Sequence, residues 1–166
     1  MKKIGIISDT HGFWDKAFKR YFSECDEIWH AGDIGHLNII DQLKEIAPLK
    51  AVFGNIDNNI IRQEYQEDEV FENKNQKIFI THIAGKLGSY YKNCREKIAL
   101  HKPDILICGH SHICKVAYDK KHQLLYINPG AAGIIGFHKV RTIIRLELND
   151  DGINNLEVIE LKRKLS

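Results

Sequence analysis

Short apolar runs recur along the first two thirds of the chain, and each is followed by a polar turn. Residues 4–7, 27–30, 49–53, 77–80 and 104–108 form these runs. Apolar runs this short, bounded by turn residues, are typical of strands that are buried on both faces of a sheet. We therefore predict five strands, each with its carboxyl end at a polar turn, and a short edge strand at 70–71.

Apolar residues at helical spacing lie between several of these runs. Residues 14–22 and 37–47 each place their large apolar side chains on one face of a helix, and the second helix stops near Pro48. Ser89 is expected to cap a third helix that runs to about residue 100. Its inward-facing residues are expected to be Tyr91, Cys94, Ile98 and Ala99. The polar segment 58–68 predicts no regular element.

The last third of the chain changes to a β pattern. Residues 115–118, 124–127, 142–148 and 153–161 are predicted strands, and Asn149-Asp150-Asp151-Gly152 is typical of a hairpin turn. A chain that alternates strands and helices and then continues as strands predicts an α/β fold. We expect a layered domain with sheets packed face to face and helices outside.

Composition narrows the class of protein. The 166 residues suit one domain spanning 1–166, and 24 basic against 22 acidic residues give a net charge of +2. A charge this small gives no support for a nucleic-acid partner or an anionic membrane. No segment approaches the roughly 20 apolar residues of a membrane helix. The four cysteines form no Cys-x-x-Cys pair, so we expect reduced thiols in a cytoplasmic protein.

The polar turns after the five predicted strands carry side chains that can bind metal. These side chains are Asp9, His11, Asp33, Asn55, His82, His110 and His112. In open α/β sheets, ligands bind at the carboxyl ends of the strands, so we expect the seven side chains to converge. His110 and His112 are two residues apart, a spacing that directs both imidazoles to one side of an extended segment.

The chemistry of this set points to a particular class of ion. Imidazoles, carboxylates and one amide oxygen suit Mn, Fe, Co, Ni or Zn better than Mg or Ca, which prefer oxygen ligands alone. Seven ligands exceed what one ion needs, and two ions that share a carboxylate fit the count better. Each residue taken singly could instead be a turn or capping residue.

Five motifs carry a resemblance to a known family. They are Asp9-Thr10-His11, Gly32-Asp33, Gly54-Asn55, Thr81-His82 and Gly109-His110-Ser111-His112. The series resembles that of the calcineurin-like binuclear metallophosphoesterases. The short length and Asn128-Pro129-Gly130 resemble the small bacterial phosphodiesterase branch of that family.

The resemblance implies a four-layer αββα sandwich of two mixed β-sheets flanked by helices. It implies hydrolysis of a small phosphodiester or phosphomonoester by a hydroxide held between two divalent ions, with Mn as the expected metal and Ni, Co, Fe or Zn as alternatives. It also implies which residues bind: Asp9, His11 and His112 one ion, Asn55, His82 and His110 the other, and Asp33 both. Asn55 would in addition be catalytic, because it would position a phosphoryl oxygen of the substrate.

The sequence departs from the wider family at Ile56. Many members carry a histidine at that position, thought to protonate the leaving group, whereas a different residue is typical of the small branch. Either the metals and solvent stabilise the leaving group, or another residue donates the proton, with His138 and His36 as candidate catalytic residues. Arg141, in a basic cluster after the Asn-Pro-Gly turn, is a candidate substrate-binding residue, and the alternative is a solvated loop. Asp57 is expected to orient a histidine that binds metal.

A second hypothesis is a non-catalytic scaffold on the same fold. A eukaryotic relative of the small branch, the retromer scaffold subunit, uses this fold as a protein-interaction platform with an impaired metal site. All seven expected ligands are present here, which favours the enzyme. A homodimer is expected only from the general frequency of twofold oligomers.

Overall fold

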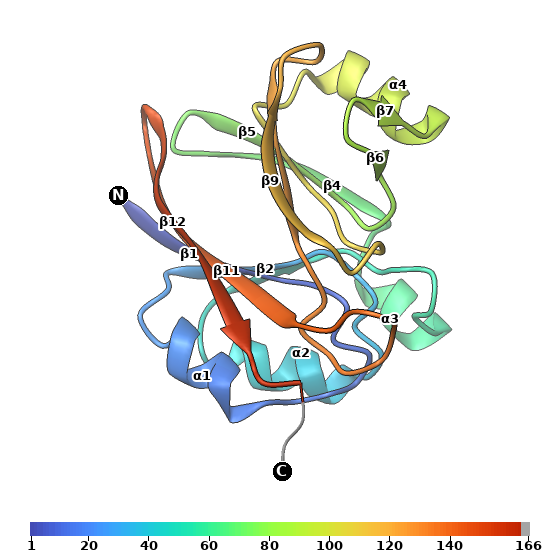
Figure 1. Cartoon of the computed structure of the whole chain (residues 1–166), viewed down its shortest axis with the longest axis vertical. Coiled ribbons are helices and arrows are strands. Elements are labelled where there is room, and N and C mark those ends of the chain that lie inside the picture. The colour runs from blue at the N-terminus through green and yellow to red at the C-terminus, as the bar shows by residue number, and fades with distance from the viewer. Residues whose placement is uncertain (164–166) are drawn as a thin grey trace.

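Two five-stranded β-sheets make up the centre of the computed structural model, which describes residues 1–163 (Figure 1). The first sheet has the order β12-β11-β1-β2-β3. Its strands are β1 (Lys2–Ile7), β2 (Glu27–His30), β3 (Leu49–Ala51), β11 (Arg141–Asn149) and β12 (Gly152–Leu161). The sheet is mixed, because β1 is parallel to β2 and antiparallel to β11.

The second sheet has the order β4-β5-β8-β10-β9 and is also mixed. Its strands are β4 (Asp68–Asn73), β5 (Gln76–Thr81), β8 (Ile105–Ile107), β9 (Cys114–Asp119) and β10 (Leu124–Pro129). The central strands β5, β8 and β10 run parallel, and the edge strands β4 and β9 pair antiparallel. A small separate hairpin joins β6 (Gly85–Lys86) to β7 (Ser89–Tyr90).

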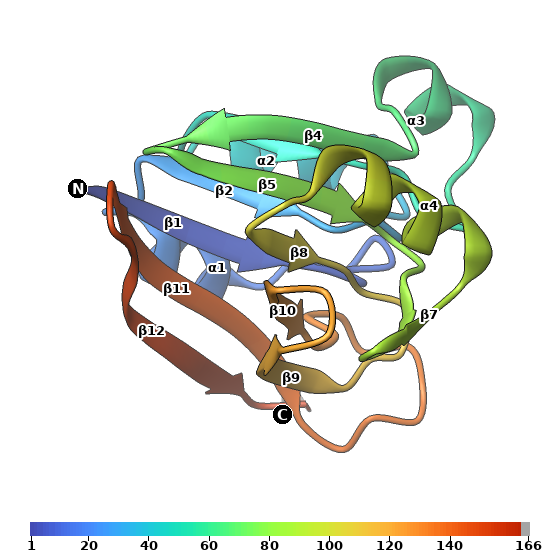
Figure 2. The same ribbon diagram turned by 90° about the horizontal axis from the view of Figure 1, so that it is seen from above.

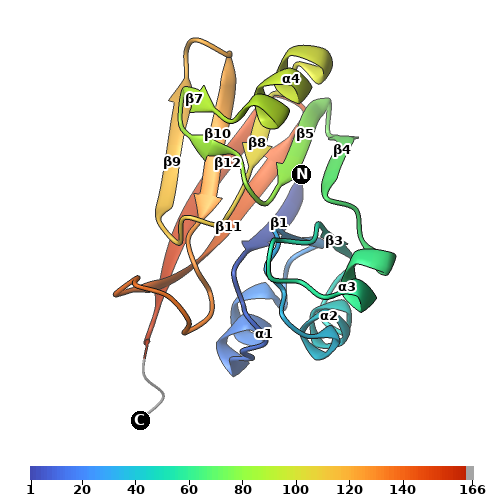
Figure 3. The same ribbon diagram turned by 90° about the vertical axis from the view of Figure 1, so that its right-hand side faces the viewer.

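Helices cover the outer faces of both sheets (Figures 2 and 3). The helices α1 (Lys16–Phe22) and α2 (Leu37–Lys44) pack against the first sheet, and α4 (Lys92–His101) packs against the second. The short α3 (Asn59–Glu64) follows β3. The predicted four-layer αββα sandwich is therefore confirmed.

Alternation along β1 shows how the sequence builds these layers. Ile4 and Ile6 pack between the two sheets, whereas Ile7 faces the helical layer. Gly5 also faces that layer, where a Cβ atom would lie 2.6 Å from the ring of Phe22. The helix α1 can therefore pack directly on the backbone of β1, as the period of two along a strand requires.

Some sequence predictions were wrong in detail. Ser89 does not cap a helix but pairs with Lys86 in the hairpin, whose turn at Gly88 has φ of +77°. The third helix begins at Lys92, and its register leaves Tyr91 and Ala99 exposed rather than inward. The second helix ends at Lys44, earlier than predicted.

The segment 58–68 contains the unforeseen helix α3, which begins where the Asn58 side chain accepts a hydrogen bond from the Ile61 N–H. The predicted hairpin turn at 149–152 and the edge position of β4 are confirmed. Among residues 1–163 no helix has the length and apolar character needed to span a membrane.

Candidate metal centre

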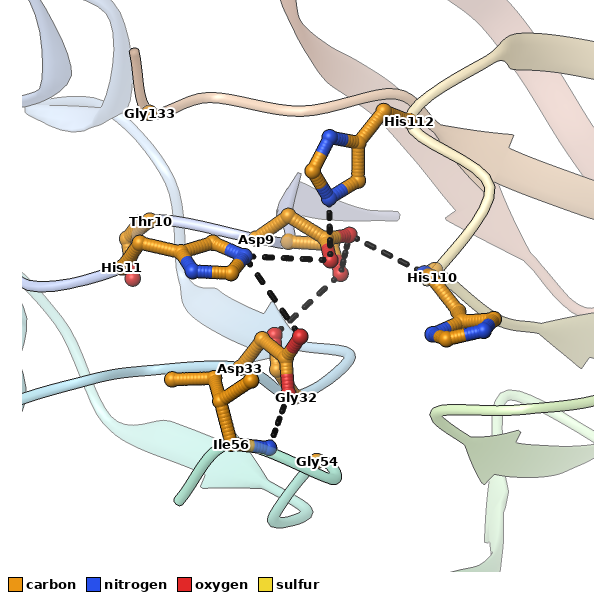
Figure 4. A network of polar contacts seen from close by, with 12 residues as sticks. Asp9, Thr10, His11, Gly32, Asp33, Gly54, Ile56, His110, His112 and Gly133 are labelled. Carbon is orange, nitrogen blue, oxygen red and sulfur yellow. Dashed lines mark hydrogen bonds and ion pairs between the residues drawn. The ribbon is translucent and has the colours of Figure 1, made fainter. Parts of the chain in front are cut away.

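Five loops meet at the carboxyl ends of β1, β2, β3, β5 and β8. Figure 4 shows residues of the loops that follow β1, β2, β3 and β8. Backbone hydrogen bonds tie neighbouring loops together: the His11 N–H donates to the Asp33 carbonyl at 3.0 Å, and the Gly109 N–H donates to the His82 carbonyl at 3.0 Å. The loops carry all the side chains that the sequence singled out as metal ligands. The loops after β1, β2 and β3 lie at one edge of the first sheet, and those after β5 and β8 lie at one edge of the second, because parallel strands end at the same edge. Contacts such as the hydrogen bond from the His110 N–H to Asp9 Oδ2 join the two edges.

The side chains form two adjacent groups. The potential ligand atoms lie within 4.8 Å of one another in each group, one being Asp9, His11 and His112 and the other Asp33, His82 and His110. Asn55 joins the second group, since its Oδ1 lies 3.1 Å from Nδ1 of His110. The structure thus brings together the residues that the resemblance assigns to each of two ions, and the assignment itself stays a prediction.

Asp9 is fully buried, and its two oxygens have different surroundings. Oδ2 accepts hydrogen bonds from Ser8 Oγ at 2.7 Å and from the His110 N–H at 3.1 Å. Oδ1 instead faces the imidazoles, with Nε2 of His112 at 3.1 Å and Nε2 of His11 at 3.8 Å. Burial alone would raise the pKa of the Asp9 carboxyl, but its neighbours, among them His11 and Ser8, lower this pKa well below its usual range.

Asp33 occupies the position between the two groups. Its Oδ1 accepts a hydrogen bond from the Ile56 N–H at 3.0 Å. Its Oδ2 lies 3.4 Å from Nε2 of His11 and 3.2 Å from Nε2 of His82. The pKa of Asp33 is lowered because the neighbouring His82 outweighs the effect of burial. One carboxylate oxygen therefore contacts an imidazole from each group.

Unpaired polar atoms show that the site fits a cation. Across residues 1–163, the buried side-chain atoms without a hydrogen-bond partner are Asp9 Oδ1, His11 Nε2, His82 Nε2 and Arg141 Nη2. Nδ1 of His82 lies 2.8 Å from the Ala31 carbonyl, which can only accept, so Nδ1 carries the proton and Nε2 has a free lone pair. Buried lone pairs that face one another without donors are the arrangement a divalent cation stabilises.

The backbone at this centre is strained. Five candidate ligands have φ in the left-handed region, with values of 52° at Asp9, 46° at His11, 55° at Asp33, 69° at His110 and 61° at His112. Non-glycine residues seldom adopt this conformation, and it persists only where surrounding contacts hold it. Gly54 must lack a side chain, because a Cβ there would collide with the carboxylate and backbone of Asp33.

Three residues behind the site hold the loops in place. The sequence analysis expected Asp57 to orient a histidine that binds metal, and this was wrong. Its buried carboxylate instead accepts backbone N–H groups of Ile34 at 3.1 Å, Gly35 at 2.7 Å and Gly54 at 2.8 Å. It thereby joins the loops that carry Asp33 and Asn55.

Asn128 and His30 are the other two residues behind the site. Asn128 donates to the Gly109 carbonyl at 2.9 Å and to Ser111 Oγ at 3.1 Å, which fixes the loop of His110 and His112. His30 accepts from the Gly32 N–H at 3.1 Å and has Nε2 3.0 Å from Thr10 Oγ1, and burial lowers its pKa to about 4. These roles need contacts between distant segments, which residue spacing does not reveal.

Two expectations about the substrate side were wrong. Arg141 is fully buried, and its guanidinium donates to Asp15 Oδ2 at 2.9 Å and to the Ala132 and Lys162 carbonyls, so it cannot reach a phosphate in this structure. Both ring nitrogens of His138 are engaged, Nε2 with the Gly133 carbonyl at 2.8 Å and Nδ1 with Nδ1 of His112 at 3.2 Å. Neither nitrogen is free to protonate a leaving group.

Comparisons with known proteins identify the family. A model of the calcineurin-like phosphoesterase superfamily domain matches residues 1–151. A probable metallophosphoesterase of Methanocaldococcus jannaschii is 34% identical over 158 residues, which cover 89% of this chain and 76% of that protein.

Solved structures share the fold. Vps29 of Entamoeba histolytica complexed with Zn²⁺ has a TM-score of 0.74 at 19% identity, covering 98% of this chain and 99% of that chain. A novel archaeal phosphodiesterase has a TM-score of 0.71 at 24% identity, covering 96% of this chain and 99% of that chain. The family match over most of the sequence shows that this chain belongs to the calcineurin-like phosphoesterase superfamily.

Proposed function

We propose that this protein is a binuclear metal-dependent phosphodiesterase that hydrolyses a small phosphate ester. The observation that carries the proposal is the position of Asp33 Oδ2, which contacts His11 of one ligand group and His82 of the other. A carboxylate oxygen shared in this way suits a bridge between two ions. The ions would be held by Asp9, His11 and His112 on one side and by Asn55, His82 and His110 on the other, with Mn²⁺ as the expected metal.

Two bound cations would lower the pKa of water to give a nucleophile and would offset negative charge on the phosphoryl and leaving oxygens. The chain's own groups orient the substrate. Asn55 Oδ1 faces His110, so its exposed amide Nδ2 is free to donate to a phosphoryl oxygen. Ile56 has no proton to give, and it is 45% exposed, so solvent can reach the leaving oxygen beside it.

A diester of small size is the substrate class that fits best. The net charge of +2 gives no support for a nucleic acid as the substrate. The archaeal phosphodiesterase of similar fold supports the choice of a diester over a monoester. We further propose that residues 1–166 act as one domain in the cytoplasm, in line with the four free cysteines.

The experiment that tests this function is metal reconstitution. Protein stripped with a chelator should be inactive, and adding Mn²⁺ should restore hydrolysis of bis-p-nitrophenyl phosphate faster than hydrolysis of p-nitrophenyl phosphate. Ni²⁺, Co²⁺, Zn²⁺ and Mg²⁺ added singly would rank the metals. Binding of two ions per chain without cleavage of either ester would reject the phosphodiesterase.

A protein-interaction scaffold is the second candidate function. The Vps29 structures show that proteins of this fold are not all named as phosphoesterases. The loop 133–140 also exposes apolar side chains close to His112, among them Ile135 at 56% and Phe137 in full. A chain that cleaves neither ester but forms a stable complex with a partner protein, and loses that complex in Phe137→Ser, would favour the scaffold.

Ile56→His is expected to raise turnover of diesters with poor leaving groups by roughly tenfold, a part of the 10²–10⁴-fold that general acids contribute. The reason is that a histidine at this half-exposed position could protonate the leaving oxygen. The measurement is the ratio of kcat/KM for an alkyl ester to that for the p-nitrophenyl ester. Ile56→Phe is the matched control, since it adds a ring that has no transferable proton. Equal changes for both esters in the histidine variant would contradict the prediction.

A further inference from the structure

Hydrogen bonds connect the Gly133 backbone through His138 to Nδ1 of His112, the ring nitrogen that points away from Asp9. Nε2 of His138 lies 2.8 Å from the Gly133 carbonyl oxygen, and Nδ1 of His138 lies 3.2 Å from Nδ1 of His112. The far nitrogen of His112, Nε2, lies 3.1 Å from Asp9 Oδ1. The two imidazole rings meet edge to face, with centroids 5.1 Å apart.

The Gly133 carbonyl determines which ring nitrogens of His138 and His112 carry protons. A carbonyl oxygen can only accept, so His138 must carry its proton on Nε2. In a neutral imidazole the other nitrogen then accepts, so the proton between the two rings belongs to Nδ1 of His112. His112 is thereby left with an unprotonated Nε2, whose lone pair faces the Asp9 carboxylate oxygen.

The loop 133–138 is built to hold this arrangement. The Gly133 N–H donates to the Asp9 carbonyl at 3.0 Å, which ties the start of the loop to a ligand residue. Gly136 has φ of +126°, and a Cβ there would collide with the ring of His112, so the backbone lies directly against this imidazole. The Gly136 carbonyl accepts a hydrogen bond from Arg163 at 2.8 Å.

We propose that His138 is a positioning residue that keeps His112 in the tautomer with an unprotonated Nε2 and so sets the affinity of the Asp9–His11–His112 group for its cation. The inference deepens the proposed function, and it rests on that function only in requiring that this group binds a cation. Partners that hold the second nitrogen of a metal-binding histidine typically contribute 10–100-fold to metal affinity.

The first test needs no substitution. In metal-free protein labelled with ¹⁵N in histidine, long-range ¹H–¹⁵N spectra should show His112 protonated on Nδ1 and His138 protonated on Nε2. A His112 that carries its proton on Nε2 would overturn the proposal. Because this spectrum is taken on the native chain, it decides the question even if a variant fails to fold.

The second test is Mn²⁺ binding to His138 variants of the full chain. His138→Phe should weaken one of two sites by roughly 10- to 100-fold and leave the other unchanged. His138→Gln should recover part of the affinity, because its amide oxygen can accept the Nδ1 proton of His112. His101→Phe is the matched control, since His101 lies in the last turn of α4.

The outcomes separate this inference from the proposed function. Two Mn²⁺ sites of native affinity in a folded His138→Phe variant would overturn the inference. A native chain that binds two Mn²⁺, shows the expected tautomers and loses one site in His138→Phe, but hydrolyses no ester, would support the inference while rejecting the phosphodiesterase. Neither readout depends on turnover.

Discussion

Asp33→Asn is expected to lower phosphodiester turnover by about 10³-fold or more, the upper range for loss of one electrostatic group in an active site. The Ile56 N–H donates to Oδ1 of Asp33, so the amide oxygen of the asparagine stays at that position. The amide nitrogen must then replace Oδ2, between the imidazoles of His11 and His82. An amide NH₂ does not bind a cation, so the shared ligand is lost.

The same substitution should not unfold the protein. Nε2 of His11 and Nε2 of His82 lack hydrogen-bond partners, and the new NH₂ group can donate to both. The melting temperature in chelator should therefore be no lower than that of the native chain. The measurements are turnover with saturating Mn²⁺, Mn²⁺ stoichiometry and thermal unfolding, with Asp41→Asn on the exposed face of α2 as control. Turnover within tenfold of that of the native chain would contradict the proposal that two ions share the Asp33 carboxylate.

Asp57→Ala is expected to lower the free energy of unfolding by about 3–5 kcal/mol. The carboxylate accepts three backbone N–H groups, and each buried donor left unpaired costs about 1–3 kcal/mol. Metal affinity should fall as well, because these bonds join the loop of Asp33 to the loop of Asn55. The effect on binding would arise without removal of any ligand.

Denaturant unfolding in chelator measures the stability loss, and Mn²⁺ titration measures the change in affinity. Asp57→Asn is the matched variant: it keeps one acceptor oxygen and should lose clearly less stability than the alanine variant. Asp41→Ala controls for removal of a carboxylate at an exposed position. An Asp57→Ala protein within 1 kcal/mol of native, a margin typical of surface substitutions, would show that the three bonds do not hold the loops.

Hydrophobic patterning predicted layered sheets with helices outside and the gathering of the candidate ligands, whereas the division into two mixed sheets came from the family resemblance. Apolar strands that end in polar turns determine both the layers and the edge at which Asp9, Asp33 and His82 meet. Such features depend on neighbours along the chain and on general rules of strand order.

Contacts between segments that are distant in the sequence explain why several sequence predictions were wrong. Arg141 stood in a basic cluster after a turn, but its partner Asp15 lies 126 residues away, and that pairing draws the guanidinium into the interior. His138 lies 26 residues from His112 in the sequence, and this spacing gives no indication that their side chains are in contact. Ser89 met the rule for a helix cap, yet the nearby glycines favoured a hairpin.

The left-handed backbone at Asp9, His11, Asp33, His110 and His112 has an evolutionary consequence. Each such residue costs of order 1 kcal/mol, and together they approach the whole stability of a typical domain, about 5–15 kcal/mol. Glycine or asparagine at these positions would relieve that cost. A lineage released from selection on the metals should therefore drift first to glycine and asparagine at these positions, and become more heat-resistant as it does so.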